Sequence, residues 1–232
     1  FCGAKAVRVA LKEENQHQLM ADDVRELITD KTRLVIINSP SNPTGAMTDQ
    51  KEIQEIYKIC NDKGIFILSD EIYSRLVFED SGEFFSPSML DFCKENVIVL
   101  NGFSKAFAMT GWRIGAAIGP KHLIEKMGLL LQTINSCVSP FIQRAAIEAI
   151  NGDQSDIRIM KDEYSERRKV LVNGLNSIEG IRCTMPKGSI YAFANISDLG
   201  MTGAEFSEFA LEQAGVALLP GEIGRASCRE RG

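Results

Sequence analysis

The sequence predicts an α/β fold: a three-layer α/β/α arrangement with a mostly parallel sheet, followed by a partial α+β subdomain. Short apolar runs alternate with amphipathic stretches over the first half of the chain. Strands that are apolar on both faces and separated by helices are typical of a parallel sheet covered on both sides. With 232 residues, the chain is also long enough to bury a core of its own.

Four short apolar runs are the predicted strands. They are Leu34–Ile37, Ile65–Leu68, Val97–Leu100 and Ile114–Ile118. Polar or turn-forming residues follow each of them. In open α/β sheets, ligands bind outside the carboxyl ends of the strands, so these following residues are where we expect the chemistry.

The amphipathic stretches predict three helices. The first runs from Thr48 to Lys63, with its apolar side chains on one stripe, and Gly64 ends it because glycine tolerates the left-handed conformation. The second runs from Ser139 to Ile150, with Ser139-Pro140 as a favourable start. The third spans 153–176, and its length suits a connector between domains.

The last part of the chain predicts a small subdomain. Two strands are expected at Ile181–Thr184 and Ile190–Phe193. Thr202 and Glu205 have the spacing of a capping box, which opens a helix that buries Phe206, Phe209 and Ala210. We therefore expect a large domain over residues 1–170, a small subdomain over 171–221 and an arginine-rich, non-native tail over 222–232.

Composition argues against several classes of protein. The formal net charge is −5 and no Lys/Arg block occurs, so neither nucleic acid nor a membrane surface is an expected partner. No apolar run approaches the roughly 20 residues of a membrane span, and no signal peptide is visible. The six cysteines form no C-x-x-C pair and only two histidines accompany them, so no metal site is expected. We therefore interpret the cysteines as buried free thiols and expect a cytoplasmic location for the protein.

Five functional side chains follow the predicted strands. They are Asn42, Asp70, Tyr73, Lys105 and Arg113. A phosphorylated pyridine aldehyde needs an amine for its aldehyde, an acid for its ring nitrogen, donors for its phenolate and a cation for its phosphate. These five residues supply that set at one rim of the sheet.

Three blocks carry a family resemblance. Asn42–Gly45, Ser69–Tyr73 and Ser104–Gly115 resemble the signature blocks of class I/II aminotransferases, the aspartate aminotransferase superfamily of fold type I. The resemblance covers roughly residues 1–221. It implies pyridoxal 5′-phosphate (PLP) as cofactor, an amino acid and a 2-oxo acid as substrates, and a homodimer as the full-length protein.

The resemblance assigns a role to each of the five residues. It implies that Lys105 bonds to PLP and moves the substrate proton, that Asp70 pairs with the pyridinium nitrogen and that Arg113 binds the phosphate. Tyr73 and Asn42 resemble the two donors to the phenolic oxygen, and Asn42 also contacts the substrate α-carboxylate, with a cis bond before Pro43. Each residue also has a structural alternative. Lys105 would be a solvated loop lysine, Asp70 a helix N-cap and Arg113 part of a surface ion pair. Tyr73 would be a core aromatic and Asn42 a turn residue.

The sequence also departs from the family pattern. Many relatives place a serine three residues before the lysine as a second phosphate ligand, whereas Gly102 stands there, so phosphate binding depends more on Arg113. Ser104 has no assigned role. The family pattern further places a Gly-rich turn and a stacking aromatic before residue 1, and a carboxylate-binding arginine after Gly221. We therefore expect the fragment alone to be inactive.

Other polar residues carry weaker signals. Tyr191 and Lys187 are interpreted as ordinary subdomain packing, with a position near the substrate entrance as the alternative. Glu71 and Glu55 are interpreted as solvated helix faces, and His122 as structural.

The block from Ala106 to Gly115 most resembles the prokaryotic aspartate/aromatic branch of the family. The first functional expectation is therefore amino transfer from aspartate or an aromatic amino acid to 2-oxoglutarate. A β-eliminating lyase of the same fold, a PLP-sensing transcription regulator and an inactive fragment remain alternatives.

Overall fold

The computed structural model describes residues 3–221. Within them lie the helices α1 (Ala21–Leu27), α2 (Gln50–Asp62), α3 (Lys121–Ile134), α4 (Pro140–Asn151), α5 (Ser155–Asn176) and α6 (Gly203–Ala214). The strands are β1 (Leu34–Asn38), β2 (Phe66–Asp70), β3 (Val97–Gly102), β4 (Gly115–Ile118), β5 (Arg182–Cys183) and β6 (Ala194–Asn195). Short 3-10 helices, among them η4 (Thr110–Trp112), lie in the loops.

The chain divides into two compact units. The first unit ends at residue 166 and also contains residues 186–191, while the second contains 167–185 and continues from 192. The change of unit therefore falls within α5, and a short later segment returns to the first unit. The domain boundary expected at residue 170 stays a prediction, and the expected tail at 222–232 lies outside the described residues.

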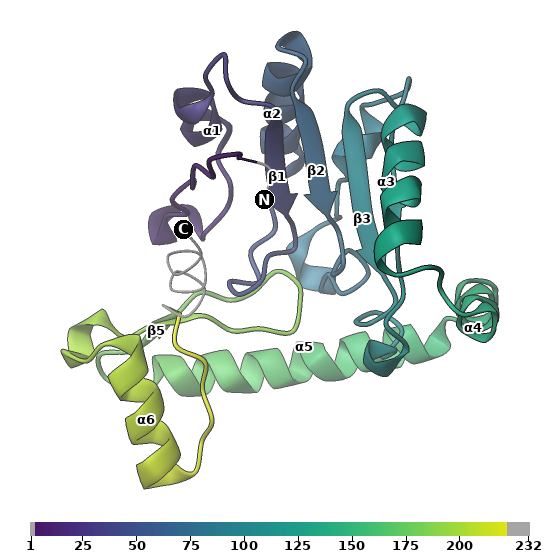
Figure 1. The fold of residues 1–232 in the computed structure, drawn as a ribbon. Helices are drawn as coiled ribbons and strands as arrows, with labels where there is room; N and C mark the ends of the chain where they lie inside the picture. Colours follow the sequence, from purple (N-terminus) through teal and green to yellow (C-terminus); the bar gives the residue numbers. More distant parts are fainter. Residues whose placement is uncertain (1–2, 222–232) are drawn as a thin grey trace. The chain divides into compact units, whose positions relative to one another are not determined.

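The first unit is built on a four-stranded sheet in the order β1-β2-β3-β4. Figure 1 shows β1, β2 and β3 side by side. β1, β2 and β3 are parallel, so the α/β class and the mostly parallel sheet are confirmed. β4 is antiparallel to β3, with Gly115 opposite Gly102; the sequence predicted a mostly parallel sheet and assigned no direction to this strand. The connection from β3 to β4 contains the 3-10 helix η4 and no α-helix, and an α-helix is the usual crossover between parallel strands.

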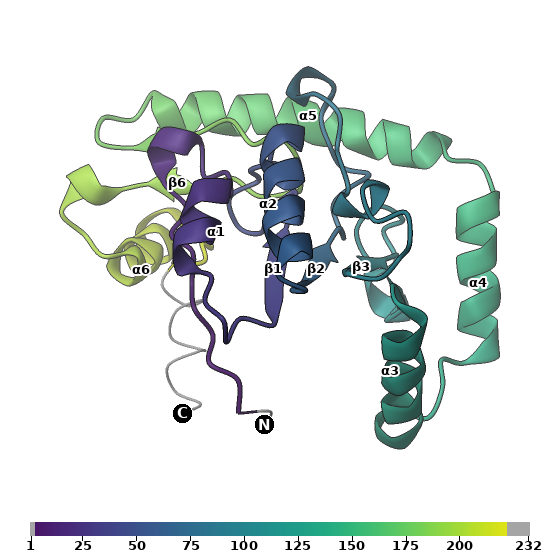
Figure 2. The same ribbon diagram turned by 90° about the horizontal axis from the view of Figure 1, so that it is seen from above.

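The core lies on one face of this sheet. α1 and α2 cover that face, while α3 lies on the other side next to β3 (Figure 2). Ile37 and Ile67 of the sheet pack with Ile53 and Ile56 of α2, and all four are at most 1% exposed. Burying one such side chain contributes roughly 1.5–3 kcal/mol. The opposite face is covered only in part, because Ile36 is 63% exposed.

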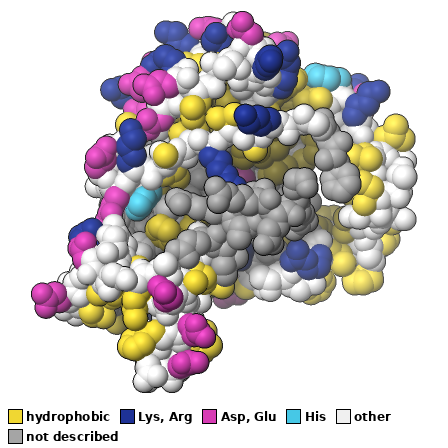
Figure 3. Space-filling model, turned by 60° about the vertical axis from the view of Figure 1, so that its left-hand side comes forward, with side chains coloured by type: hydrophobic (Ala, Val, Ile, Leu, Met, Phe, Trp, Pro, Cys, Tyr) yellow, Lys and Arg dark blue, Asp and Glu magenta, His cyan; other side chains and the backbone are white. Residues whose placement is uncertain are grey.

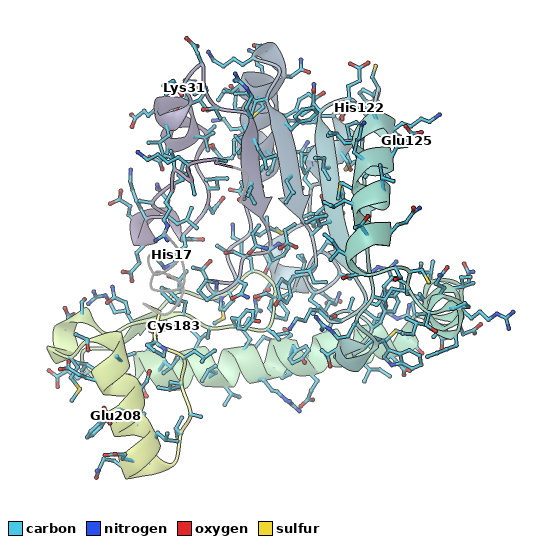
Figure 4. All side chains as sticks on the ribbon, viewed as in Figure 1. His17, Lys31, His122, Glu125, Cys183 and Glu208 are labelled. Atoms are coloured by element: carbon cyan, nitrogen blue, oxygen red, sulfur yellow. The ribbon has the colours of Figure 1, made fainter. Side chains whose placement is uncertain are left out.

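His122 is part of the partial cover on that second face. It lies in the first turn of α3 (Figure 4), and its ring centroid is 6.4 Å from that of Phe66 on β2. The structural interpretation of His122 is therefore in keeping with its contact. Basic and acidic side chains are mixed rather than segregated on the face shown in Figure 3.

Several local predictions are confirmed and others are wrong. Gly64 has a positive φ of 62° just after α2, and Thr202 and Glu205 form the expected capping box. Phe209 was expected to be buried but is 50% exposed. The strand expected at Ile190–Phe193 is wrong: residues 190 and 191 are in the segment that returns to the first unit, and β6 begins only at Ala194.

The cysteines also differ from expectation in part. Cys60 and Cys183 are buried free thiols, as predicted, but Cys93 and Cys137 are exposed. Cys2 and Cys228 lie outside the described residues. None of the helices between residues 3 and 221 is long and apolar enough to cross a membrane.

Candidate active site

The polar residues meet at the carboxyl edge of the sheet because of how its strands run. β2 ends at Asp70 and β3 ends at Asn101 and Gly102. Arg113 precedes β4, and because β4 runs antiparallel, its first residues lie at the edge where β3 ends. A parallel β4 would have carried Arg113 to the opposite edge of the sheet.

A pocket of about 360 Å³ opens at this edge. Asp70 and Arg113 both line it, so one carboxylate and one guanidinium face the same space. The other lining residues are Ile72, Leu100, Asn101, Gly102, Ser104, Ile114 and Gly115. The volume falls in the range of small-molecule sites, roughly 300–1,000 Å³.

Asp70 lies half-buried at the last position of β2. Its Oδ1 accepts a hydrogen bond of 3.3 Å from the backbone N–H of Ile72. A turn rather than a helix follows, so the alternative role of Asp70 as a helix N-cap is excluded.

Arg113 ends η4 in the left-handed conformation, with φ 51°. One Nη donates to the carbonyl oxygen of Thr110 at 3.0 Å, which leaves other guanidinium donors directed elsewhere. Arg113 forms no ion pair with a carboxylate of residues 3–221, so the alternative of a surface ion pair finds no support there.

Tyr73 and Asn42 meet at a third residue, Tyr191. The Tyr73 hydroxyl donates to the Tyr191 hydroxyl at 3.0 Å, and the two rings pack edge to face. Asn42 donates to the same Tyr191 hydroxyl from its side-chain amide at 3.4 Å. Burial, and next the hydrogen bond with Tyr191, raise the pKa of Tyr73, so the Tyr73 phenol stays protonated at neutral pH. The Asn42-Pro43 bond is cis, as predicted.

Lys105 lies in the loop that follows β3 and is half-buried. Its Nζ is 5.8 Å from the centroid of the Tyr73 ring, a cation–π distance. The loop closes on itself through backbone bonds from Ala108 to the Lys105 oxygen and from Met109 to the Phe103 oxygen. These bonds fix the backbone of the loop, and the partial burial of Lys105 and its contact with Tyr73 argue against a freely solvated side chain.

The structure thus groups the five predicted residues through two sets of contacts. Asp70 and Arg113 share the pocket, while Asn42 and Tyr73 share Tyr191. Lys105 adjoins both sets, since it follows the pocket-lining Ser104 in the chain and its Nζ lies beside the Tyr73 ring. The roles that the resemblance implies for these residues remain predictions.

The interpretation of Tyr191 as subdomain packing is wrong, because Tyr191 belongs to the first unit. Residues 186–191 return to the first unit, where Lys187 and Gly188 donate backbone bonds to the Gly45 oxygen. A Cβ at Gly45 would lie 2.4 Å from the Cβ of Pro186, so this approach requires glycine. No periodic pattern in the sequence marks this return.

Two other minor predictions have different outcomes. Glu71 was expected on a solvated face but is 6% exposed, and it accepts a 2.5 Å bond from the Ser86 hydroxyl. Burial raises the pKa of Glu71, and the Ser86 bond opposes that shift in part. Glu55 lies partly exposed with its carboxylate 3.6 Å from Arg25.

Gly102, the departure from the family pattern, has a local steric explanation. A Cβ at this position would lie 2.8 Å from the Cδ1 of Ile72. Ile72 thus occupies the space that a larger residue at 102 would need. Both residues line the pocket, so this pair shapes the pocket wall.

Comparisons with known proteins agree with this geometry. The family model described as aminotransferase class I and II matches residues 1–231. An aspartate aminotransferase of Pyrococcus horikoshii is 42% identical over 220 residues, which cover 94% of this chain and 56% of that protein. An aromatic-amino-acid aminotransferase of Thermococcus litoralis is 39% identical and is covered to 57%.

Solved structures show the same relationship. A crystal structure of an aromatic aminotransferase from Pyrococcus horikoshii matches with a TM-score of 0.88 at 39% identity, over 93% of this chain and 58% of that one. An aspartate aminotransferase from Thermus thermophilus, solved with maleate, matches with a TM-score of 0.87 at 33% identity, over 93% of this chain and 56% of that one. The chain spans a little more than half the length of these relatives. It belongs to the family of class I and II aminotransferases.

Proposed function

We propose that the protein carrying this chain transfers an amino group from an amino acid to a 2-oxo acid, with PLP bound at the carboxyl edge of the sheet. One observation carries the proposal: a carboxylate and a guanidinium line one pocket there, and a lysine amine lies on the loop beside it. The family assignment supports the same chemistry.

The residues at this edge fit the cofactor. Arg113 has unpaired guanidinium donors at the pocket, which suit a phosphate dianion, and Asp70 presents an anion that suits a protonated ring nitrogen. Bound PLP supplies an electron sink for the bonds at the substrate α-carbon. Tyr73 lies beside Lys105, and Asn42 contacts Tyr191, the same residue that Tyr73 contacts. The Lys105 amine takes and returns the α-proton.

The substrates and the assembly are further parts of the proposal. Several relatives are named for aspartate or aromatic amino acids, which supports these as donors, and 2-oxoglutarate is the proposed acceptor. Large apolar side chains exposed on α3 and α4 (Leu129, Leu130, Ile134 and Phe141) support a homodimer. The four described cysteines are free thiols, which supports a cytoplasmic location.

The test uses the full-length protein from the reading frame that contains this sequence. Purified protein mixed with PLP is expected to gain a visible absorbance band that Lys105→Ala abolishes and that Lys187→Ala, a control on another loop, retains. Aspartate and aromatic donors with 2-oxoglutarate should yield glutamate. Release of pyruvate and ammonia instead of glutamate would identify a lyase, and no absorbance change with PLP would refute the cofactor.

A further inference from the structure

Three consecutive side chains in the turn that follows β2 contact neighbouring segments. Tyr73 meets Lys105 and Tyr191, and Ser74 accepts a 3.3 Å hydrogen bond from the side chain of Asn101. The third side chain, Arg75, has no role in the function proposed above. Its contacts connect the lysine loop to the helices that follow the sheet.

One side of Arg75 is fixed by Gln154. Its Nη1 donates to the Gln154 Oε1 at 2.6 Å. The amide nitrogen of Gln154 in turn donates to the carbonyl oxygens of Ala149, at 3.0 Å, and Gly152, at 2.8 Å. These carbonyls belong to the end of α4 and to the turn before α5. Gln154 is therefore oriented by the backbone that connects these two helices.

The other side of Arg75 lies on the lysine loop. Its guanidinium carbon is 5.1 Å from the centroid of the Phe107 ring, a cation–π contact. The Phe107 ring packs on that of Phe103 at 5.2 Å between centroids. Lys105 lies midway between these two phenylalanines in the chain, so the rings anchor both flanks of the residue.

Within residues 3–221, no carboxylate forms an ion pair with Arg75. Arg75 shares a hollow of about 240 Å³ with Arg158 and Lys161, and no Asp or Glu lines this hollow. The guanidinium is therefore oriented by a neutral amide and an aromatic face, both of which match its planar shape. The ammonium group of a lysine is not planar, so it can neither stack on the Phe107 ring nor present the fixed set of donors that a guanidinium presents.

We propose that Arg75 is a positioning residue, which holds the Phe103–Phe107 loop so that the Lys105 amine points at its reacting partner. The proposal rests on the proposed function of Lys105. Displacing a reacting group by about 1 Å can cost about a hundredfold in rate. Because Phe103 still anchors one flank, we expect Arg75→Met to lower kcat about tenfold and to change KM less than about twofold.

The test compares three variants of the full-length protein. Arg75→Met removes both contacts, Arg75→Lys keeps the charge without the planar group, and Arg158→Met removes a charge from the same hollow. Arg75→Met should also shift the pH titration of the bound cofactor's visible absorbance. Arg75→Lys should lose about threefold in kcat, and Arg158→Met should match the wild type.

A second readout needs no cofactor. Amide hydrogen exchange over residues 103–109 should be faster in Arg75→Met than in Arg158→Met or the wild type. Equal exchange and an unchanged pH titration would overturn the positioning role, as would equal effects of the two methionine variants. Faster exchange in a protein that binds no PLP would support the contact network but refute the proposed function, so the two failures are distinguishable.

Discussion

The steric pair Gly102 and Ile72 allows a quantitative prediction about the wall of the pocket. In Gly102→Ala the new Cβ would meet the Ile72 Cδ1 at 2.8 Å, and we expect this overpacking to cost about 1 kcal/mol, since the atom ends a flexible side chain. Gly102 has an ordinary φ, so the loss of glycine entropy in the unfolded chain offsets part of this cost. Ile72→Val should cost about 0.5–1 kcal/mol on its own.

The double variant isolates the contact. Valine lacks the Cδ1 atom, so Gly102→Ala should no longer meet an obstacle in the Ile72→Val background, and the two changes should couple by about 1 kcal/mol. The entropy contribution of Gly102→Ala cancels in this cycle. Urea unfolding monitored by circular dichroism gives the free energies of unfolding of the wild type, the two single variants and the double variant. The comparison holds if the dependence of this free energy on urea concentration is the same for all four.

Gly115→Ala is the matched control. A Cβ there would lie 2.9 Å from the backbone oxygen of Asn101, an atom that Ile72→Val leaves in place. Gly115→Ala and Ile72→Val should therefore add within about 0.5 kcal/mol. If Gly102→Ala and Ile72→Val are also additive, the steric explanation for Gly102 is wrong.

Two other predictions concern buried titratable groups. Burial raises the pKa of Glu71, so the folded protein binds a proton more tightly than the unfolded chain, and this contribution to stability declines as pH rises above the ordinary value of 4.5 towards the folded pKa. Glu71→Gln should flatten that decline in urea midpoints measured across this window, and an unchanged slope would contradict it. Burial also raises the pKa of Cys60 to about 11, whereas Cys93 and Cys137 are exposed. Alkylation of the folded protein, mapped by mass spectrometry, should therefore label Cys93 and Cys137 well before Cys60. Equal labelling rates would show that the core opens readily.

Much of the first unit followed from local patterns in the sequence. The run Leu34–Ile37 and the helix expected from Thr48 to Lys63 are found within a residue or two of β1 and α2. Their apolar periods reflect burial against a single neighbouring layer, which a one-dimensional pattern records well. The direction of β4 was not predictable in that way, because an apolar run has the same composition whichever way it pairs.

The candidate site shows the same division. Asn42, Asp70, Tyr73 and Lys105 follow strands or lie in motifs, so the sequence pointed to them directly. Tyr191 comes from a segment more than a hundred residues away from its partners, and only the close approach of Gly45 to Pro186 brings it back. Such long-range contacts leave no periodic signal.

The antiparallel strand and the two glycines that face each other across it are parts of one arrangement. Arg113 reaches the carboxyl edge only because the chain reverses between β3 and β4, and the reversal places Gly102 and Gly115 side by side. A Cβ at Gly102 would meet Ile72, and one at Gly115 would meet the Asn101 oxygen, so larger residues at either position would press on the strand ends that hold Asp70 and Arg113 apart. The space between Asp70 and Arg113 therefore depends on glycine at positions 102 and 115. A serine at position 102 that binds phosphate would require a side chain smaller than isoleucine at position 72.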